Sequence, residues 1–145
     1  MGHIEATKQL SVAPEALWAT VSDLSSWDKW FTIHEKWMEE PPATLVPGAT
    51  LVAKIVMLGM ANKIEWKVEK VTAPTTLALS GTGMAGVKCM FEFTVTPSGD
   101  GSQFNVAGDF EGALIKGALG KAVEKDGAKQ LDKTLAQLEA LASAA

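Results

Sequence analysis

The sequence predicts an α+β domain in which an antiparallel sheet packs against one long C-terminal helix. From Gly48 to Glu111 apolar and polar residues alternate with a period of two, the pattern of an antiparallel sheet with one solvent-facing side. After Gly112 the period changes to 3.6 and continues to about Ala142, which predicts a helix of about 30 residues. The chain has 145 residues, 47% of them hydrophobic, so it can bury an ordinary core, and we expect a single domain over residues 1–145.

The first 40 residues predict a strand and two short helices ahead of the main sheet. Residues 3–12 form an extended segment, and Pro14 then occupies a first-turn position where a helix tolerates a missing amide. Ser25 and Ser26 are candidate N-caps of a second short helix. The residues spaced to share one face of that helix are Trp27, Trp30 and Phe31. Residues 34–39 alternate only partly and predict a further strand.

In the segments that follow, the alternation indicates which residues face inward. In residues 63–69 the inward positions alternate with charged ones and are Ile64, Trp66 and Val68. In the segment before it they are Leu51, Ala53, Ile55 and Met57, and the turn between the two is Leu58-Gly59-Met60. A shorter strand follows with Leu77 and Leu79. The last two strands flank a hairpin turn at 97–101, and their inward residues are Val87, Cys89, Phe91, Phe93, Val95, Phe104, Val106, Gly108 and Phe110.

Lys8 breaks the pattern of the first strand. If Ile4 and Leu10 face inward, Lys8 does too, and burying an unpaired lysine is costly. We expect a bulge at this point; otherwise the side chain reaches a strand end or forms an ion pair with an acid such as Glu111.

The long helix offers little side-chain volume in its N-terminal half. One face collects Gly120, Glu124, Gly127, Leu131, Thr134, Leu135, Leu138 and Ala142, with Lys116 and Val123 at its border. Either the helix begins only near Lys121, or its glycines admit close contact with the sheet, or the space beneath them is a cavity. A cavity would hold the polar end of an apolar ligand through Lys116, Glu124 or His34. Its walls would be Ile55, Met57, Trp66, Phe91, Phe93 and Phe110.

Composition argues against direct recognition of nucleic acid. All 13 basic residues are lysines, and the net charge is −4. Arginine is the usual residue for bidentate recognition of phosphate and guanine, and a negatively charged protein repels a polyanion. Residues 1–40 hold seven acids against three lysines. This acidic segment is either a solvated face or a docking surface for a basic partner.

Residue types that carry catalysis or bind metals are scarce. Cys89 is the only cysteine, and its inward phase among aromatic residues predicts an inert core thiol. His3 and His34 are the only histidines, a poor supply of metal ligands. We expect no cofactor, no metal and no catalytic residue, with an acid–base role for His34 beside Glu92 or Asp109 as the alternative. The free thiol, the lack of a leader segment and the lack of about 20 consecutive apolar residues predict a cytoplasmic protein without a membrane span.

The opening of the chain resembles a known superfamily. Residues 13–18 (Ala-Pro-Glu-Ala-Leu-Trp), 21–24 (Val-Ser-Asp-Leu) and 27–30 (Trp-Asp-Lys-Trp) are similar to the opening signature of the SRPBCC superfamily, which includes START lipid-transfer domains and the polyketide cyclase/dehydrase family. The resemblance implies the helix-grip fold, a curved seven-stranded antiparallel sheet wrapped around a long C-terminal helix, with two short helices after the first strand. It also implies a hydrophobic cavity between sheet and helix, gated by the second short helix, and it carries over no catalytic residue.

This resemblance places three candidate residues near the mouth of the cavity, namely Trp27, Trp30 and His34. The alternative is that both tryptophans anchor the short helix to its core and that His34 is a surface or hydrogen-bonded residue. The full set of candidate ligand-binding residues is Trp27, Trp30, His34, Ile55, Met57, Ile64, Trp66, Phe91, Phe93, Phe110, Lys116, Gly120 and Glu124.

Two functions from different classes follow. The first is non-catalytic binding of a small hydrophobic ligand, lipid or polyketide-like. The second rests on residues 22–27, 33–34, 36–37, 81–83 and 86–88, which are similar to a bacterial branch of the superfamily that forms the toxin half of a toxin–antitoxin pair. That function implies docking to a macromolecule and an antitoxin or other protein as partner. An enzyme of the polyketide cyclase/dehydrase type is a third alternative.

Overall fold

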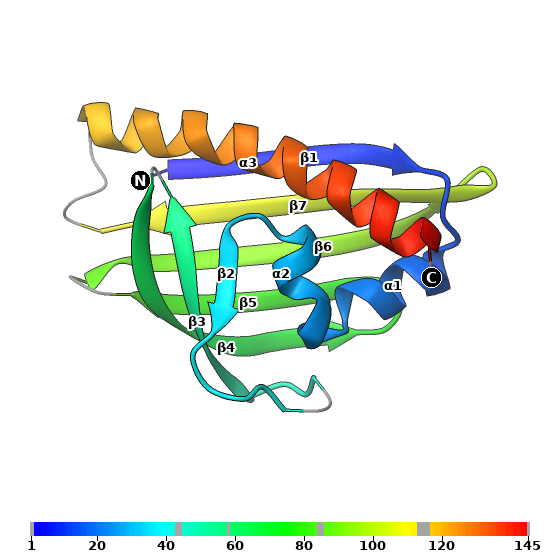
Figure 1. Cartoon of the computed structure of the whole chain (residues 1–145), viewed down its shortest axis with the longest axis horizontal. Helices are drawn as coiled ribbons and strands as arrows, with labels where there is room; N and C mark the ends of the chain where they lie inside the picture. Colours follow the sequence, from blue (N-terminus) through cyan, green and yellow to red (C-terminus); the bar gives the residue numbers. More distant parts are fainter. Residues whose placement is uncertain (1, 43–44, 58, 84–85, 113–116, 145) are drawn as a thin grey trace.

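The computed structural model describes residues 2–42, 45–57, 59–83, 86–112 and 117–144, and it confirms the predicted sheet and long helix (Figure 1). Within these ranges seven strands form one antiparallel sheet in the order β1-β7-β6-β5-β4-β3-β2. The strands are β1 (Gly2–Leu10), β2 (His34–Trp37), β3 (Thr50–Met57), β4 (Met60–Thr72), β5 (Thr76–Gly83), β6 (Lys88–Ser98) and β7 (Gly101–Glu111). The helical elements are α1 (Pro14–Val21), the 3-10 turn η1 (Leu24–Ser26), α2 (Trp27–Trp30) and α3 (Gly117–Ala144).

The sheet curls around the helices that cover its concave face. Figure 1 shows α3 running along β1 and β7, with its C-terminal end beside α1, while β2 and β3 fold over toward α2. The alternating residues of β4, namely Ile64, Trp66 and Val68, are all buried, as the period of two predicted. The leucines of the C-terminal half of α3 close the core from the other side. This is the helix-grip fold expected from the sequence.

At Gly127, α3 lies close to strand β1. Gly117, the first residue of α3, has a positive φ of 54° and is not an interior helix residue. The sequence predicted a helix from just after Gly112, but residues 113–116 lie outside the described residues. A Cβ on Gly127 would lie 2.6 Å from Cγ2 of Ile4 on β1. Close helix-on-sheet contact is thus confirmed at Gly127.

The bulge expected at Lys8 is wrong. β1 and β7 pair without interruption, with Lys8 opposite Phe104. Lys8 is exposed, and its Nζ lies 3.5 Å from Oε1 of Glu139 on α3. An ion pair with the long helix, and not with Glu111, therefore accommodates the lysine at an inward position.

Candidate functional site

Aromatic rings fill the centre of the concave face, where the sequence predicted cavity walls. Phe31, at the end of α2, has its ring centroid 5.5 Å from those of both Phe91 and Phe93. Trp66 lies 5.7 Å from Phe91, and Trp27 lies 5.8 Å from Phe93. A space large enough for water would leave accessible surface on the side chains around it, yet these five rings are at most 2% exposed. The protein's own rings therefore close the centre of this region.

Trp27 and Trp30 anchor α2. The indole nitrogen of Trp27 donates to the Val21 carbonyl oxygen at 2.9 Å, and that of Trp30 donates to Oγ of Ser26 at 3.2 Å. Both rings are fully buried. These contacts hold the short helix against the core, which is the role the sequence offered as the alternative to a place at the mouth.

Two buried polar side chains of the interior have no hydrogen-bond partner in the described part of the chain. One is His34, on β2, which is 4% exposed and whose Nδ1 and Nε2 are both unpaired. The other is Trp66, on β4, which is 1% exposed and whose indole N–H is unpaired. Native proteins leave few such groups, because an unsatisfied buried donor or acceptor costs about 1–3 kcal/mol.

The other buried polar side chains are satisfied. Ser26, Ser102 and Thr20 each donate to a main-chain carbonyl oxygen, Ser102 to that of Val12 at 2.6 Å. Thr134 accepts the backbone N–H of Thr32 at 3.1 Å. The two unpaired groups are therefore exceptions in a core that otherwise satisfies its hydrogen bonds.

His34 is held as a neutral imidazole at neutral pH. Its ring lies 4.4 Å from that of Trp37 and 5.9 Å from that of Trp27. Burial lowers the pKa of His34 to about 4, and the charge of Asp28 opposes that shift only in part. Apolar neighbours that desolvate the ring thus favour its uncharged form.

The polypeptide just ahead of His34 is fixed to the long helix. Thr32 donates through its Oγ1 to the Gln130 carbonyl oxygen at 2.9 Å, in addition to the bond from its backbone N–H to Thr134. These bonds tie the connection between α2 and β2 to the middle of α3, which fixes the position of His34.

The interior is less tightly closed beneath the N-terminal half of α3. Ile55 of β3 is 7% exposed and Val123 of α3 is 8% exposed, whereas the leucines Leu131 and Leu138 further along α3 have no exposed surface. Met57 is half-buried at the end of β3. Of the other candidate residues at this end, Ile64, Phe110 and Gly120 are buried, and Lys116 lies outside the described residues.

Asn62 is an inner-face residue outside the set of candidate site residues predicted from the sequence. It pairs with Ile55 across β3 and β4, and Ile55 in turn pairs with His34 of β2. A Cβ on the neighbouring Gly83 would lie 3.5 Å from Oδ1 of Asn62. Extending the alternation of Ile64, Trp66 and Val68 back by two residues would have found it. Asn62 thus adds a neutral polar group to the less closed end of the interior.

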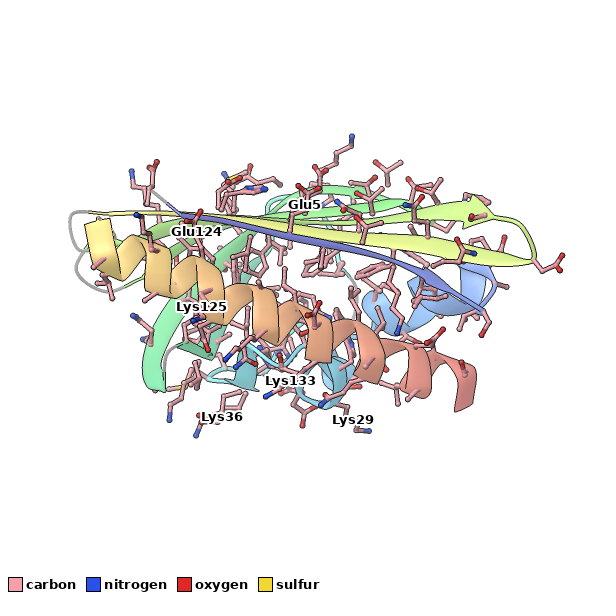
Figure 2. The ribbon with its side chains drawn as sticks, turned by 90° about the horizontal axis from the view of Figure 1, so that it is seen from above. Glu5, Lys29, Lys36, Glu124, Lys125 and Lys133 are labelled. Atoms are coloured by element: carbon pink, nitrogen blue, oxygen red, sulfur yellow. The ribbon has the colours of Figure 1, made fainter. Side chains whose placement is uncertain are left out.

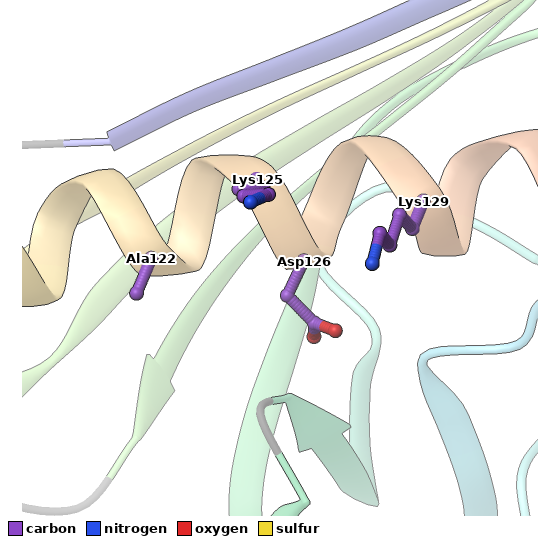
Figure 3. Close-up of a pocket in the computed structure, with 4 residues that line it drawn as sticks. All are labelled: Ala122, Lys125, Asp126 and Lys129. Carbon is purple, nitrogen blue, oxygen red and sulfur yellow. The ribbon is translucent and has the colours of Figure 1, made fainter.

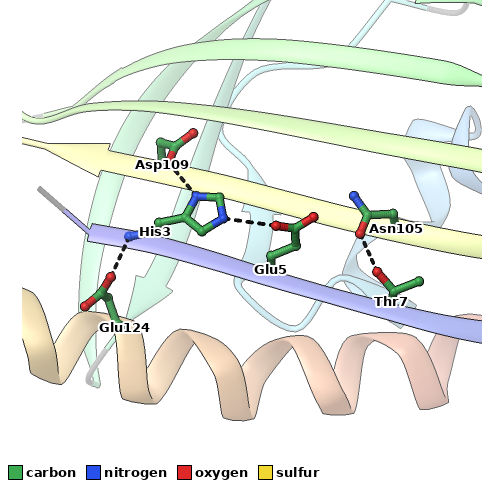
Figure 4. Close-up of polar contacts among 6 residues, drawn as sticks. All are labelled: His3, Glu5, Thr7, Asn105, Asp109 and Glu124. Atoms are coloured by element: carbon green, nitrogen blue, oxygen red, sulfur yellow. Dashed lines mark hydrogen bonds and ion pairs between the residues drawn. The ribbon is translucent and has the colours of Figure 1, made fainter.

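Glu124 points to the edge of the sheet and not into the interior. Its Oε2 accepts the backbone N–H of His3 at 2.9 Å (Figure 4). The His3 ring in turn bonds to Asp109 through Nδ1 at 2.6 Å and to Glu5 through Nε2 at 3.2 Å. Hydrogen bonds to Asp109 and Glu5 raise the pKa of His3. This exposed cluster of hydrogen bonds connects β1, β7 and α3.

Charged side chains lie on both sides of α3. Figure 2 shows Glu5 and Glu124 on the β1 side of the helix, and Lys29, Lys36 and Lys133 on the opposite side. A shallow pocket of about 200 Å³ on α3 is lined by Ala122, Lys125, Asp126 and Lys129 (Figure 3). In Figure 3, all four of these side chains project from α3.

The site has few groups suited to acid–base or nucleophilic chemistry. Burial raises the pKa of the Cys89 thiol to about 12, which keeps it protonated. Asp109, the acid considered as a partner for His34, bonds to His3 instead. Among the described residues no cluster of His, Cys, Asp and Glu could hold a metal ion. In the same residues no helix is long and apolar enough to cross a membrane.

A curled antiparallel sheet around one long helix, with an apolar inner face, defines a START-like helix-grip domain. The chain belongs to the family described as polyketide cyclase / dehydrase and lipid transport, whose profile matches residues 1–143. A START superfamily protein from Mycobacterium smegmatis superimposes with a TM-score of 0.77 at 17% identity, over 97% of this chain and 99% of that one. Resemblance to the SRPBCC superfamily is therefore confirmed.

Two relatives come from Mycobacterium tuberculosis strain H37Rv. The uncharacterized protein Rv1546 is 31% identical over 141 residues, which covers 97% of this chain and 99% of the relative. A protein named Toxin Rv0910 is 28% identical over 123 residues, which covers 85% of each chain.

Proposed function

We propose that the protein binds a small hydrophobic ligand, lipid or polyketide-like, between the sheet and α3. The observation that carries the proposal is that the apolar inner face keeps slight exposure at one end, where Ile55 is 7% exposed, Val123 is 8% exposed and Met57 is half-buried. Apolar, concave surfaces with a few polar groups are what small-molecule sites use. Membership of a lipid-transport family supports the same function.

The ligand lies at the less closed end of the interior, with the aromatic centre as its floor. Ile55, Met57, Ile64, Phe110 and Gly120 surround it. Trp66 and Phe91 form the floor, and binding displaces side chains that close this region in the free protein. The whole chain acts as one domain, without a cofactor, and its single buried thiol suits the cytoplasm.

Native mass spectrometry of the freshly purified protein tests this function. A ligand held without a covalent bond adds mass under native conditions and is lost on denaturation. Gly120→Leu places a bulky side chain on the buried face of α3 and is expected to abolish the added mass in a folded protein. Ala136→Leu, at an exposed position of the same helix, is the matched control and should retain it. Equal ligand retention by both folded variants would contradict the proposed site.

A second candidate function is that of a toxin acting by docking to a macromolecule, with an antitoxin as partner. The observation in its favour is the 28% identity to a protein named as a toxin. Glu39 and Glu40 are exposed after β2, whereas Glu35 is engaged with Lys54 at 2.9 Å. Induced expression should arrest growth, and Glu39→Lys with Glu40→Lys should relieve the arrest. Normal growth at high expression without an antitoxin would remove this candidate.

A further inference from the structure

We propose that the ligand of this site is uncharged and carries a carbonyl or hydroxyl oxygen on an apolar body, with Trp66 and His34 as the groups that recognise its polar atoms. The inference rests on the proposed function and specifies the chemistry of its ligand. It starts from the two side chains of the interior that are more than nine-tenths buried and lack a hydrogen-bond partner in the described chain.

Trp66 sets the first requirement, because an indole can only donate. Three other indole nitrogens have protein acceptors: Trp27 and Trp37 donate to main-chain carbonyl oxygens, and Trp30 donates to Ser26. The Trp66 N–H is buried on the inner face and has no acceptor among the residues that the structure describes. A ligand oxygen that accepts this bond would remove the cost of leaving it unmade.

His34 sets the second requirement. A neutral imidazole has one nitrogen that donates and one that accepts, and within the described ranges neither nitrogen of His34 has a partner. The lowered pKa of His34, about 4, keeps it neutral at pH 7, so it offers no positive charge to an anion. A carbonyl oxygen can accept from His34, and a hydroxyl group can either donate or accept.

The absence of buried cations sets the third requirement. No lysine, aspartate or glutamate is buried within the described residues. Lys8 and Lys54 are engaged with Glu139 and Glu35 on the surface. A ligand carboxylate placed next to Trp66 would lose its hydration without gaining a counter-ion, which costs far more than burying a ketone.

Three probes of similar shape separate these requirements: naphthalene, 2-acetylnaphthalene and 2-naphthoate. Calorimetric titration at pH 7 is expected to give 2-acetylnaphthalene an affinity about tenfold or more above that of each of the other two. In a ¹⁵N-resolved NMR spectrum, the indole proton of Trp66 should move downfield with 2-acetylnaphthalene and not with naphthalene. The indole protons of Trp27, Trp30 and Trp37 already have acceptors and should move less.

Variants assign the recognition to named side chains. Trp66→Phe should abolish the preference for 2-acetylnaphthalene over naphthalene, and His34→Phe should reduce it. Trp30→Phe also removes a buried indole, but one whose N–H already has an acceptor, so it is the matched control and should keep the preference. An unchanged preference in a folded Trp66→Phe variant would overturn the inference.

The remaining outcomes separate this inference from the proposed function. Tighter binding of 2-naphthoate would overturn the inference and leave hydrophobic ligand binding standing. Equal binding of naphthalene and 2-acetylnaphthalene would do the same. Failure of all three probes to bind, together with a bare mass in the native spectrum, would count against the proposed function itself.

Discussion

His34 makes stability depend on pH at the scale of a single residue. Its pKa falls from 6.5 to about 4 in the folded protein because burial disfavours the charged ring. The unfolded chain therefore takes up a proton at a higher pH than the folded chain. The stability linked to neutral His34 is complete above about pH 6.5 and is lost as the pH falls toward 4. This shift in pKa lowers the free energy of unfolding by about 2 to 3 kcal/mol at pH 4.5 relative to neutral pH.

The measurement is urea unfolding of the wild type and of His34→Phe at pH 7 and pH 4.5. We expect the wild type to lose about 2 to 3 kcal/mol more than the variant between these two pH values. The comparison removes the contribution of the carboxylates, which both proteins share. An equal loss of unfolding free energy in the two proteins would mean that the buried ring does not stay neutral.

His3 is predicted to titrate in the opposite direction. Hydrogen bonds to Asp109 and Glu5 raise its pKa above 6.5. Its contribution to stability is therefore present below pH 6.5 and is lost as the pH rises through the raised pKa. An NMR titration of the two ring signals should place the His3 midpoint above 6.5 and the His34 midpoint well below it. Asp109→Asn should bring the His3 midpoint back toward 6.5 and leave that of His34 unchanged, which assigns the two signals.

At the scale of elements, glycines let aromatic rings lie flat on the sheet. Gly108 of β7 faces the ring of Phe91 on β6, and a Cβ built on Gly108 would overlap that ring. Gly108→Ala should therefore force Phe91 to shift and cost about 1–3 kcal/mol in the free energy of unfolding. Gly83→Ala on β5 is the matched control, because its Cβ would meet nothing closer than 3.5 Å. Similar losses in both variants would show that the cost comes from the strand and not from the ring.

The helices and strands also show which parts of the fold can be predicted from the sequence. Strict alternation around Ile64, Trp66 and Val68 was enough to assign a strand and its inner face, because the period of a strand is independent of what packs on it. The ion pair of Lys8 with Glu139 was not predictable, since it depends on where the helix crosses the sheet. Phe31 was predicted to share a face with Trp27 and Trp30, but its contacts with Phe91 and Phe93 depend on how the short helix docks on the sheet.

Some candidate site residues could likewise be placed from the sequence, and others could not. Lining residues such as Ile55 and Phe110 could be assigned to the inner face from their phase alone. Glu124 could not be placed, because a helix period gives the position of the Cα and not the hydrogen bond that turns the carboxylate toward His3. The unpaired nitrogen of Trp66 was equally hidden, since its lack of a partner depends on every group packed around it.

At the scale of the whole molecule, α3 is held unevenly along its length. Its C-terminal half buries Leu131, Leu135 and Leu138, and Glu139 adds bonds to Lys8 and to the backbone N–H of Ser11. The N-terminal half contains two interior glycines, each of which costs about 1 kcal/mol of helix stability relative to alanine. Local opening in proteins starts where burial and helix stability are lowest.

We therefore predict that the N-terminal half of α3 opens ahead of the rest of the protein and gives a ligand access to the interior. Hydrogen exchange should be faster for the amides of residues 121–126 than for those of residues 131–141. Bound 2-acetylnaphthalene should slow exchange in the first range, because a ligand that binds only the closed form stabilises it by RT ln(1 + c/Kd), where c is the free ligand concentration. Gly120→Ala, which raises helix stability with a small side chain, should slow exchange in the same range without ligand. Uniform protection along α3 would contradict opening at this end, and access to the site would then have to pass through the loops at the ends of the strands.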